Sequence, residues 1–139
     1  MSTTPLAELA RYLDELVSDL KDSLGAEWGG QMSIDLTPML IPTDRAVSIG
    51  LIASELVINA TKYAYPGSTG PIDIALEQHR NRLRLIVADQ GVGAAGDRTG
   101  FGSRMMSAVM TRLGGELSHD DNHPGLRAIV TAPIEDTPK

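Results

Sequence analysis

The sequence predicts a two-layer α/β (α+β) sandwich, in which helices pack on one face of a mixed β-sheet. Apolar residues recur at helical spacing in three segments, and between these segments short stretches alternate apolar and polar residues as strands do. The resulting order of elements, α-β-α-β-β-α-β-β, favours helices gathered on one side of a single sheet. With 139 residues, no internal repeat and no long linker, the chain is expected to form one domain over residues 1–139.

The first half of the chain supplies two helices and one strand. Leucines at helical spacing predict a helix from residue 6 to about residue 24. Residues 32–36 alternate apolar and polar side chains and predict a short strand, which Pro38 ends. A second helix is expected from residue 43 to about residue 64, with Thr43 as its N-cap. The two helices each present an apolar face that needs a sheet to cover it.

The second half of the chain supplies the rest of the sheet. Residues 72–78 and 82–89 predict two strands paired through a short hairpin. Residues 90–102 hold five glycines and are expected to form a loop, after which residues 103–113 return to helical spacing. Two closing strands are expected after this helix, at residues 115–119 and 126–133.

Composition excludes several classes of function. The chain has no cysteine, which excludes disulfides, thiolate zinc sites and a cysteine nucleophile and fits a reducing, cytoplasmic location. The net charge of -6 argues against nucleic-acid binding and against attraction to anionic membranes. No apolar run reaches the roughly 20 residues that span a bilayer, so we expect no membrane insertion.

The second helix carries a polar stripe. Glu55, Asn59 and Lys62 fall within a narrow sector of a helical wheel. Leu51 and Ile58 border this stripe, whereas a simple solvated face would not place apolar residues there. We therefore interpret the stripe as the wall of a pocket, with an exposed Glu–Lys pair on a solvated face as the alternative. The opposite side of the helix is the expected core face: Ile49, Ala53, Leu56, Val57, Ala60 and Ala64.

Two glycine pairs flank the loop between the hairpin and the last helix. Asp89 ends the second hairpin strand and is followed at once by Gln90-Gly91-Val92-Gly93. Glycines there let the backbone turn sharply and let a flat ligand approach without a Cβ in the way. Gly100-Phe101-Gly102-Ser103 then runs directly into the last helix, whose free N–H groups and positive dipole end suit a phosphate.

Together these segments resemble the motifs of the Bergerat-fold (GHKL) ATPases, the superfamily that includes histidine kinases and gyrase. Residues 55–64 resemble the N box, residues 89–93 the first glycine box, and residues 100–102 the second. The sequence of the N box and its flanks, from Gly50 to Pro66, is most similar to the HWE and HisKA_2 types of bacterial histidine kinase. The resemblance covers roughly residues 6–133 and implies an ATP-binding catalytic domain.

The resemblance also implies a role for each polar residue. Asn59 would coordinate Mg²⁺ through its amide oxygen, and Glu55 would orient a water on that metal or assist proton removal. Lys62 would neutralise phosphate charge, and Asp89 would accept a hydrogen bond from the amino group of adenine. The other residues that the resemblance places around the nucleotide are Tyr63, Gly91, Gly93, Gly100, Phe101, Gly102 and Ser103.

The function implied is that of a sensor histidine kinase catalytic domain. It would transfer the γ-phosphate of ATP to a histidine on a separate phosphoacceptor and dimerisation domain, which would lie before residue 1, and a response regulator would act downstream. Two alternatives stay open: a serine-protein kinase of the anti-sigma-factor type, and a non-catalytic adaptor with the same fold. Leu126 stands where the family often has threonine, so we expect modest nucleotide affinity.

Histidines and methionines complete the list of candidate residues. His119 and His123 flank an acidic stretch in a predicted loop, where a metal site that includes Asp120 and Asp121 is a minor alternative to an ordinary polar turn. His79 is expected in the hairpin. The methionines of the last helix are interpreted as core filling: Met105, Met106 and Met110.

Overall fold

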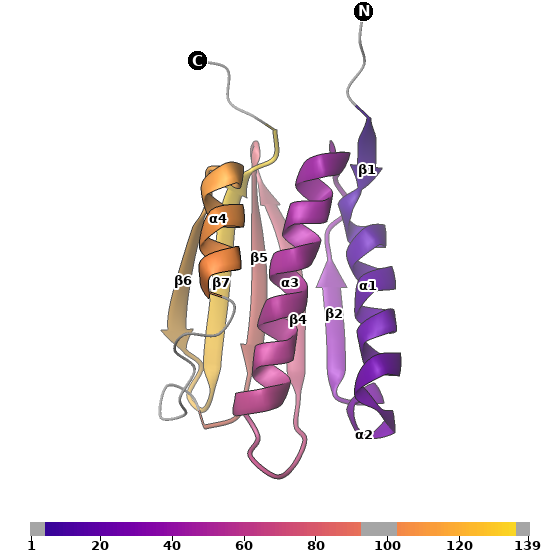
Figure 1. Ribbon diagram of the computed structural model, residues 1–139, viewed down its shortest axis with the longest axis vertical. Helices are drawn as coiled ribbons and strands as arrows, with labels where there is room; N and C mark the ends of the chain where they lie inside the picture. The colour runs from indigo at the N-terminus through magenta and orange to yellow at the C-terminus, as the bar shows by residue number, and fades with distance from the viewer. Residues whose placement is uncertain (1–4, 93–102, 136–139) are drawn as a thin grey trace, which may run out of the picture.

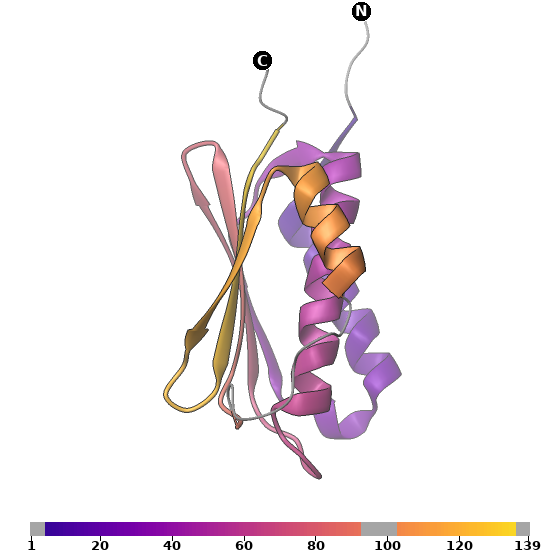
Figure 2. The same cartoon turned by 60° about the vertical axis from the view of Figure 1, so that its left-hand side comes forward.

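The computed structural model describes residues 5–92 and 103–135, and its elements form two layers (Figure 1). Three main helices, α1 (Leu9–Leu24), α3 (Thr43–Tyr63) and α4 (Ser103–Leu113), lie side by side on one face of a five-stranded sheet. Figure 2 shows the sheet as one layer and the helices as the other, with the opposite face of the sheet left uncovered by any helix. The predicted two-layer α/β sandwich is confirmed.

The sheet is mixed. Its spatial order is β2-β4-β5-β7-β6, and β2 pairs in parallel with β4 while every other pair is antiparallel. The hairpin predicted between the two central strands is present, and it puts Asp89 opposite Ile72 at one end. The strand bounds are Met32–Leu36 for β2, Ile72–His79 for β4, Arg82–Asp89 for β5, Glu116–Asp121 for β6 and Leu126–Pro133 for β7.

The hydrophobic core lies between the two layers. In β4 and β5, alternate residues are buried, because side chains along a strand point to opposite faces and only one face meets the helices. All six residues of the predicted core face of α3 are buried: Ile49, Ala53, Leu56, Val57, Ala60 and Ala64. Gly50 lets α1 approach α3 closely, because a Cβ at this position would lie 2.7 Å from the ring of Tyr12.

The first helix begins three residues later than predicted. Leu6–Glu8 form a short strand, β1, which pairs with β3 (Leu40–Pro42) in a separate two-stranded sheet. The carboxylate of Glu8 then caps α1, accepting hydrogen bonds from the backbone amides of Ala10 (2.8 Å) and Met39 (3.2 Å). A long-range strand pairing therefore overrides the helical spacing of the first leucines.

The prediction that Thr43 caps α3 is wrong. Pro42 occupies the N-cap position, without a side-chain cap bond, and Thr43 is the first helical residue. Its backbone amide donates instead to the carbonyl of Pro5, at 3.0 Å. Because β3 leads directly into the helix beside β1, the residue that precedes β1 accepts a hydrogen bond from an amide that a capping side chain would otherwise serve.

Arg45 connects three elements at one end of the molecule. Its side chain is only 4% exposed, and its guanidinium donates to the carbonyl oxygens of Leu113 and Pro133, both at 2.7 Å. One side chain from the first turn of α3 thus holds the end of α4 and the end of β7.

None of the helices in residues 5–92 and 103–135 combines the length and the apolar character that spanning a membrane would need.

Candidate functional site

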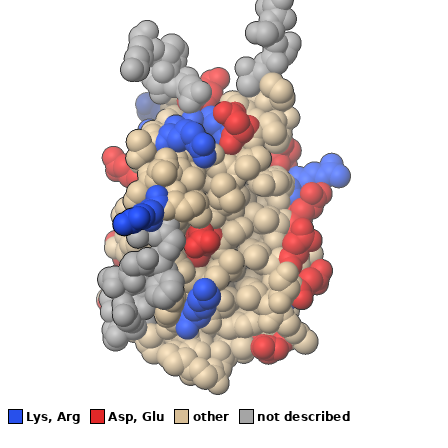
Figure 3. Space-filling model, in the orientation of Figure 1, with Lys and Arg blue, Asp and Glu red and all other residues tan. Residues whose placement is uncertain are grey.

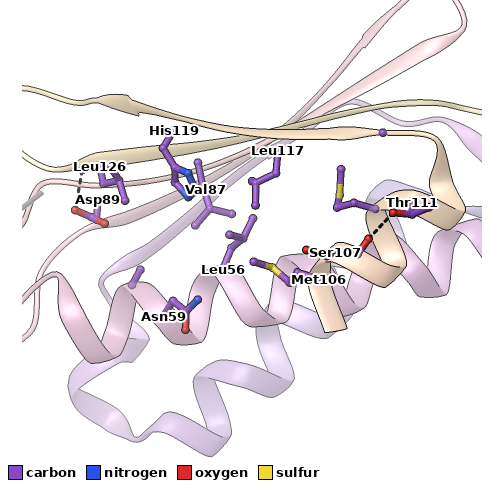
Figure 4. Close-up of a pocket in the computed structure, with 14 residues that line it drawn as sticks. Leu56, Asn59, Val87, Asp89, Met106, Ser107, Thr111, Leu117, His119 and Leu126 are labelled. Carbon is purple, nitrogen blue, oxygen red and sulfur yellow. Dashed lines mark hydrogen bonds between the residues drawn. The ribbon is translucent and has the colours of Figure 1, made fainter. Parts of the chain in front are cut away.

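A cavity of about 480 Å³ opens between the sheet and the helices α3 and α4 (Figure 4). Its walls are mostly apolar, formed by side chains such as Leu56, Val87 and Leu126. Five polar side chains reach it from different elements, and both Asn59 and Asp89 from the predicted site are among them. The lining consists of Leu56, Asn59, Ala60, Val87, Asp89, Met106, Ser107, Met110, Thr111, Gly115, Leu117, His119, Leu126 and Ala128.

Asp89 is a buried carboxylate held in place by backbone groups. It is 3% exposed, and one of its carboxylate oxygens, Oδ1, accepts hydrogen bonds from the amides of Gly91 (3.0 Å) and Leu126 (3.2 Å). Its backbone carbonyl accepts a further bond from the side-chain amide of Asn122, at 2.7 Å. These contacts come from both sides of the strand end, so the carboxylate is a fixed hydrogen-bond acceptor in the cavity wall.

Two glycines allow the chain to close around Asp89. A Cβ at Gly91 would lie 1.9 Å from the carbonyl oxygen of Ala64, the residue that caps α3. The amide of Val92 donates to that same carbonyl, at 2.9 Å. A Cβ at Gly125 would lie 1.9 Å from the carbonyl oxygen of Asp89, and Gly125 also has a φ of 106°. The sequence singled out Gly91 as a site residue, whereas Gly125 was not among the predicted site residues.

Tyr65 links the end of α3 to the segment after Asp89. Its phenol accepts a hydrogen bond from the backbone amide of Gln90, at 2.8 Å, and donates one to the carbonyl of Pro71. Its ring lies against Gly70 and 6.3 Å from the ring of Trp28, centroid to centroid. Sequence reasoning included this tyrosine in the motif but assigned it no role, because its partners are distant in the sequence.

Of the three residues in the polar stripe of α3, one lines the cavity and two lie outside it. Asn59 is half-buried and lines the cavity, and Figure 4 shows its amide rising from the helix towards the sheet. Glu55 and Tyr63 are half-buried and Lys62 is exposed, and none of these three belongs to the cavity lining. Leu51, which borders the stripe, is 45% exposed. The helix therefore offers the cavity an amide, with a carboxylate and an ammonium on the same side of the helix beyond it.

The second glycine box falls outside the described residues. Gly100, Phe101 and Gly102 are therefore not described, and neither is Gly93 of the first glycine box. Ser103 is described only as the first residue of α4. That helix begins where the sequence predicts. Its buried Met106 and Met110 fill the space against the cavity, as expected, whereas Met105 is 36% exposed and faces away.

The acidic stretch near the C-terminus differs from its prediction. β6 runs to Asp121, two residues further than predicted, so Asp120 and Asp121 lie in a strand and not in a loop, and the side chain of His119 lines the cavity. Asp120 contacts Arg127 at 3.4 Å, and Asp121 lies 3.5 Å from His123. Successive strand residues point to opposite faces. Within the described ranges, accordingly, no three histidine or acidic side chains gather in a metal-binding group, and the alternative metal site is not formed.

Charge is distributed unevenly over the face that the helices cover (Figure 3). Acidic side chains line the edge formed by α1, whose exposed residues include Asp14, Glu15, Asp19 and Asp22. On the other side, α4 borders the cavity and carries the exposed Arg104 and Arg112. An anionic ligand entering the cavity therefore approaches away from the main acidic edge.

Comparisons with known proteins identify the family of the chain and its fold. A family model described as a histidine kinase-like ATPase domain matches residues 34–128. The histidine kinase domain of the Erythrobacter litoralis EL346 blue-light activated histidine kinase is similar, with a TM-score of 0.78 and 24% identity over 91% of this chain and 61% of that one. The chain thus spans 61% of the length of that solved domain.

Two further solved structures share the fold. The histidine kinase domain of the E. coli osmosensor EnvZ has a TM-score of 0.70 and 18% identity over 100% of this chain and 94% of that one. The mycobacterial sensor histidine kinase MprB has a TM-score of 0.70 and 18% identity over 97% of this chain and 100% of that one. No curated protein matches. On the family match, which spans the helix with Asn59 and the strand with Asp89, the chain belongs to the histidine kinase-like ATPase domains.

Proposed function

We propose that this chain is the ATP-binding catalytic domain of a two-component sensor histidine kinase. The observation that carries the proposal is the placement of Asp89: a buried carboxylate, fixed by two backbone amides, in a largely apolar cavity that Asn59 also lines. Cavities that hold small ligands usually have volumes of roughly 300–1,000 Å³ and few polar groups, and this one fits that description.

The base of ATP would bind at the end of the cavity near Asp89. A carboxylate only accepts hydrogen bonds, so it pairs with the exocyclic amino group of adenine and is repelled by the carbonyl that guanine carries at the same position. The apolar side chains of Val87 and Leu126 would lie against the faces of the base. Gly91 keeps the chain close to α3 beside this end.

The phosphates would extend from there along α3 towards the start of α4. Asn59 and Glu55 offer oxygen ligands one helical turn apart, which suits Mg²⁺, a hard cation that takes its remaining ligands from phosphates and water. Bound Mg²⁺ would neutralise phosphate charge. Lys62 would add a point charge from the same stripe. We assign the remaining contacts to Tyr63, Gly93, Gly100, Phe101, Gly102 and Ser103.

Transfer of the γ-phosphate would require a histidine on a separate phosphoacceptor and dimerisation domain. His79, His119 and His123 are all exposed, and His119 also lines the cavity wall on the sheet. In-line transfer needs the acceptor nitrogen about 3–3.5 Å from the phosphorus, and a rigid strand does not bring its own histidine there. Tethering in a full kinase would supply an acceptor at roughly millimolar effective concentration.

Nucleotide binding is tested by calorimetry and thermal unfolding with Mg-ATP and Mg-GTP. At 100 times its dissociation constant, ATP should stabilise the fold by about 2.7 kcal/mol and raise the melting temperature by several degrees, whereas GTP should have little effect. Asp89→Asn should weaken ATP binding by about 1–3 kcal/mol, because a donor then faces the amino group of adenine. Asp35→Asn, an exposed change on β2, is the control. No response to millimolar Mg-ATP would favour the adaptor alternative.

Phosphotransfer is tested with γ-labelled ATP. The chain alone should label itself negligibly, and acid-labile label should appear on an added phosphoacceptor fragment. Acid-labile label in stoichiometric amount on the chain alone would contradict the proposal. Acid-stable label on serine of a separate protein would point to the anti-sigma-factor type of kinase.

A further inference from the structure

His119 is a polar group at the base-binding end of the cavity that the proposed function does not use. It lies on β6 directly opposite Ala128 of β7, and both residues line the cavity together with Leu117. Because alternate strand residues share a face, Leu117 and His119 both point towards the helices. Figure 4 shows the imidazole on the sheet side of the cavity near Val87, with Asn59 on α3 across from it.

The position of His119 relative to Asp89 follows from the register of the strands. Leu126 is the cavity-lining residue diagonal to His119 across the β6–β7 pair, and its amide donates to the carboxylate of Asp89. The directly opposite residue is Ala128, whose small side chain leaves room above the sheet. The imidazole therefore lies on the same wall of the cavity as Val87 and Asp89, on the far side of β7 from β5.

Asp89 cannot satisfy a purine base alone. Adenine carries one amino group, which a carboxylate accepts, but it also carries ring nitrogens that need donors. A buried acceptor without a donor costs roughly 1–3 kcal/mol, and the walls around this end are apolar. Three other polar side chains of described residues line the cavity. Asn59 is the proposed Mg²⁺ ligand, and Ser107 and Thr111 lie on α4, where the hydroxyl of Thr111 donates to the carbonyl of Ser107.

We infer that His119 is a specificity-determining residue, whose imidazole N–H donates a hydrogen bond to a ring nitrogen of the adenine base. Asp89 then recognises the amino group and His119 a ring nitrogen, while Asn59 stays available for the phosphate side of the ligand. The inference rests on the proposed nucleotide binding and adds a contact from β6. Base recognition thus uses two strands, β5 and β6, which pair with opposite edges of β7.

Two substitutions separate hydrogen bonding from packing. His119→Leu replaces the imidazole by an apolar side chain of similar bulk and so removes the donor. ADP binding measured by calorimetry without Mg²⁺ should then weaken roughly 5- to 30-fold. His119→Gln keeps an N–H donor and should bind ADP within about 3-fold of the wild type. His79→Leu is the matched control, because His79 is exposed at the end of β4 that lies farthest from Asp89 along the β4–β5 hairpin. Thermal unfolding checks that each variant is folded.

Base analogues identify the contact itself. ADP analogues in which N1, N3 or N7 is replaced by C–H are titrated against the wild type and His119→Leu. For one analogue, the wild type should lose affinity while His119→Leu loses nothing further, since that variant already lacks the bond. Losses that add for all three analogues would overturn the inference, and so would a loss in His119→Leu that is larger for ATP than for ADP.

The remaining outcomes distinguish this inference from the function on which it rests. A wild-type chain that binds ADP tightly, with His119→Leu binding it equally well, would overturn only the role of His119. A wild-type chain that binds no adenine nucleotide would overturn the proposed function and this inference together.

Discussion

The backbone amide of Gln90 donates a hydrogen bond of 2.8 Å to the phenol oxygen of Tyr65, 25 residues earlier in the chain. This bond joins the segment after α3 to the segment after β5, and so holds the residue next to Asp89 from the side of the helix layer. The same phenol donates to the carbonyl of Pro71, so one hydroxyl joins the start and the end of the α3–β4 connection to the residue after Asp89.

Tyr65→Phe should therefore weaken nucleotide binding as well as destabilise the fold. The ring keeps its packing against Gly70 and Trp28, while both hydrogen bonds are lost. We expect an unfolding free energy lower by about 1–2 kcal/mol and ADP affinity reduced severalfold. Calorimetry and denaturant unfolding measure the two effects, with Tyr12→Phe on α1 as the control. Unchanged ADP affinity would show that Tyr65 has no positioning role.

Gly91→Ala should disrupt the site by a steric clash. The new Cβ would lie 1.9 Å from the carbonyl oxygen of Ala64, and backbone cannot move aside as a flexible side chain can. Overpacking of this kind typically costs about 1–3 kcal/mol, and the shift would displace the segment that follows Asp89. Gly29→Ala is the matched control, since a Cβ there meets nothing within 4 Å. Equal melting temperatures for the two variants would contradict the prediction.

Asn59→Ala should separate metal binding from base binding. The variant loses the amide proposed as a Mg²⁺ ligand but leaves Asp89 and its two amide contacts intact. ADP without Mg²⁺ should bind almost as it does to the wild type, whereas the gain in affinity on adding Mg²⁺ should fall. Paired titrations with and without Mg²⁺ measure this, with Asn81→Ala in the β4–β5 turn as control. Equal losses under both conditions would count against Asn59 as the ligand.

Arg45→Met should lower stability without acting on the base directly. The buried guanidinium donates to the carbonyls of Leu113 and Pro133, and its loss leaves two carbonyl oxygens without these donors. We expect a loss of about 2–4 kcal/mol in unfolding free energy, measured by denaturant titration. Arg11→Met, an exposed change on α1, should change the unfolding free energy by less than about 0.5 kcal/mol. An Arg45→Met variant as stable as the wild type would show that the hydrogen bonds of Arg45 to Leu113 and Pro133 are not needed for stability.

The sequence by itself determined the elements whose signals are local. The buried face of α3, the hairpin that ends on Asp89 and the start of α4 after the second glycine box all follow from periodicities of two or 3.6 residues and from glycines beside them. Asn59 and Asp89 could be named as candidates for the same reason, because their positions on a helix and a strand end are readable within a short window.

Tertiary structure alone decided the contacts that join distant segments. Leu126 meets Asp89 across 37 residues, and Leu6–Glu8 become a strand only because Leu40–Pro42 lie beside them. His119 lines the cavity because β6 pairs with β7 along its length and lies in the sheet beside it, opposite the helices. Pairing between strands and close approach of backbones depend on where the rest of the chain lies, and no local pattern of residues contains that information.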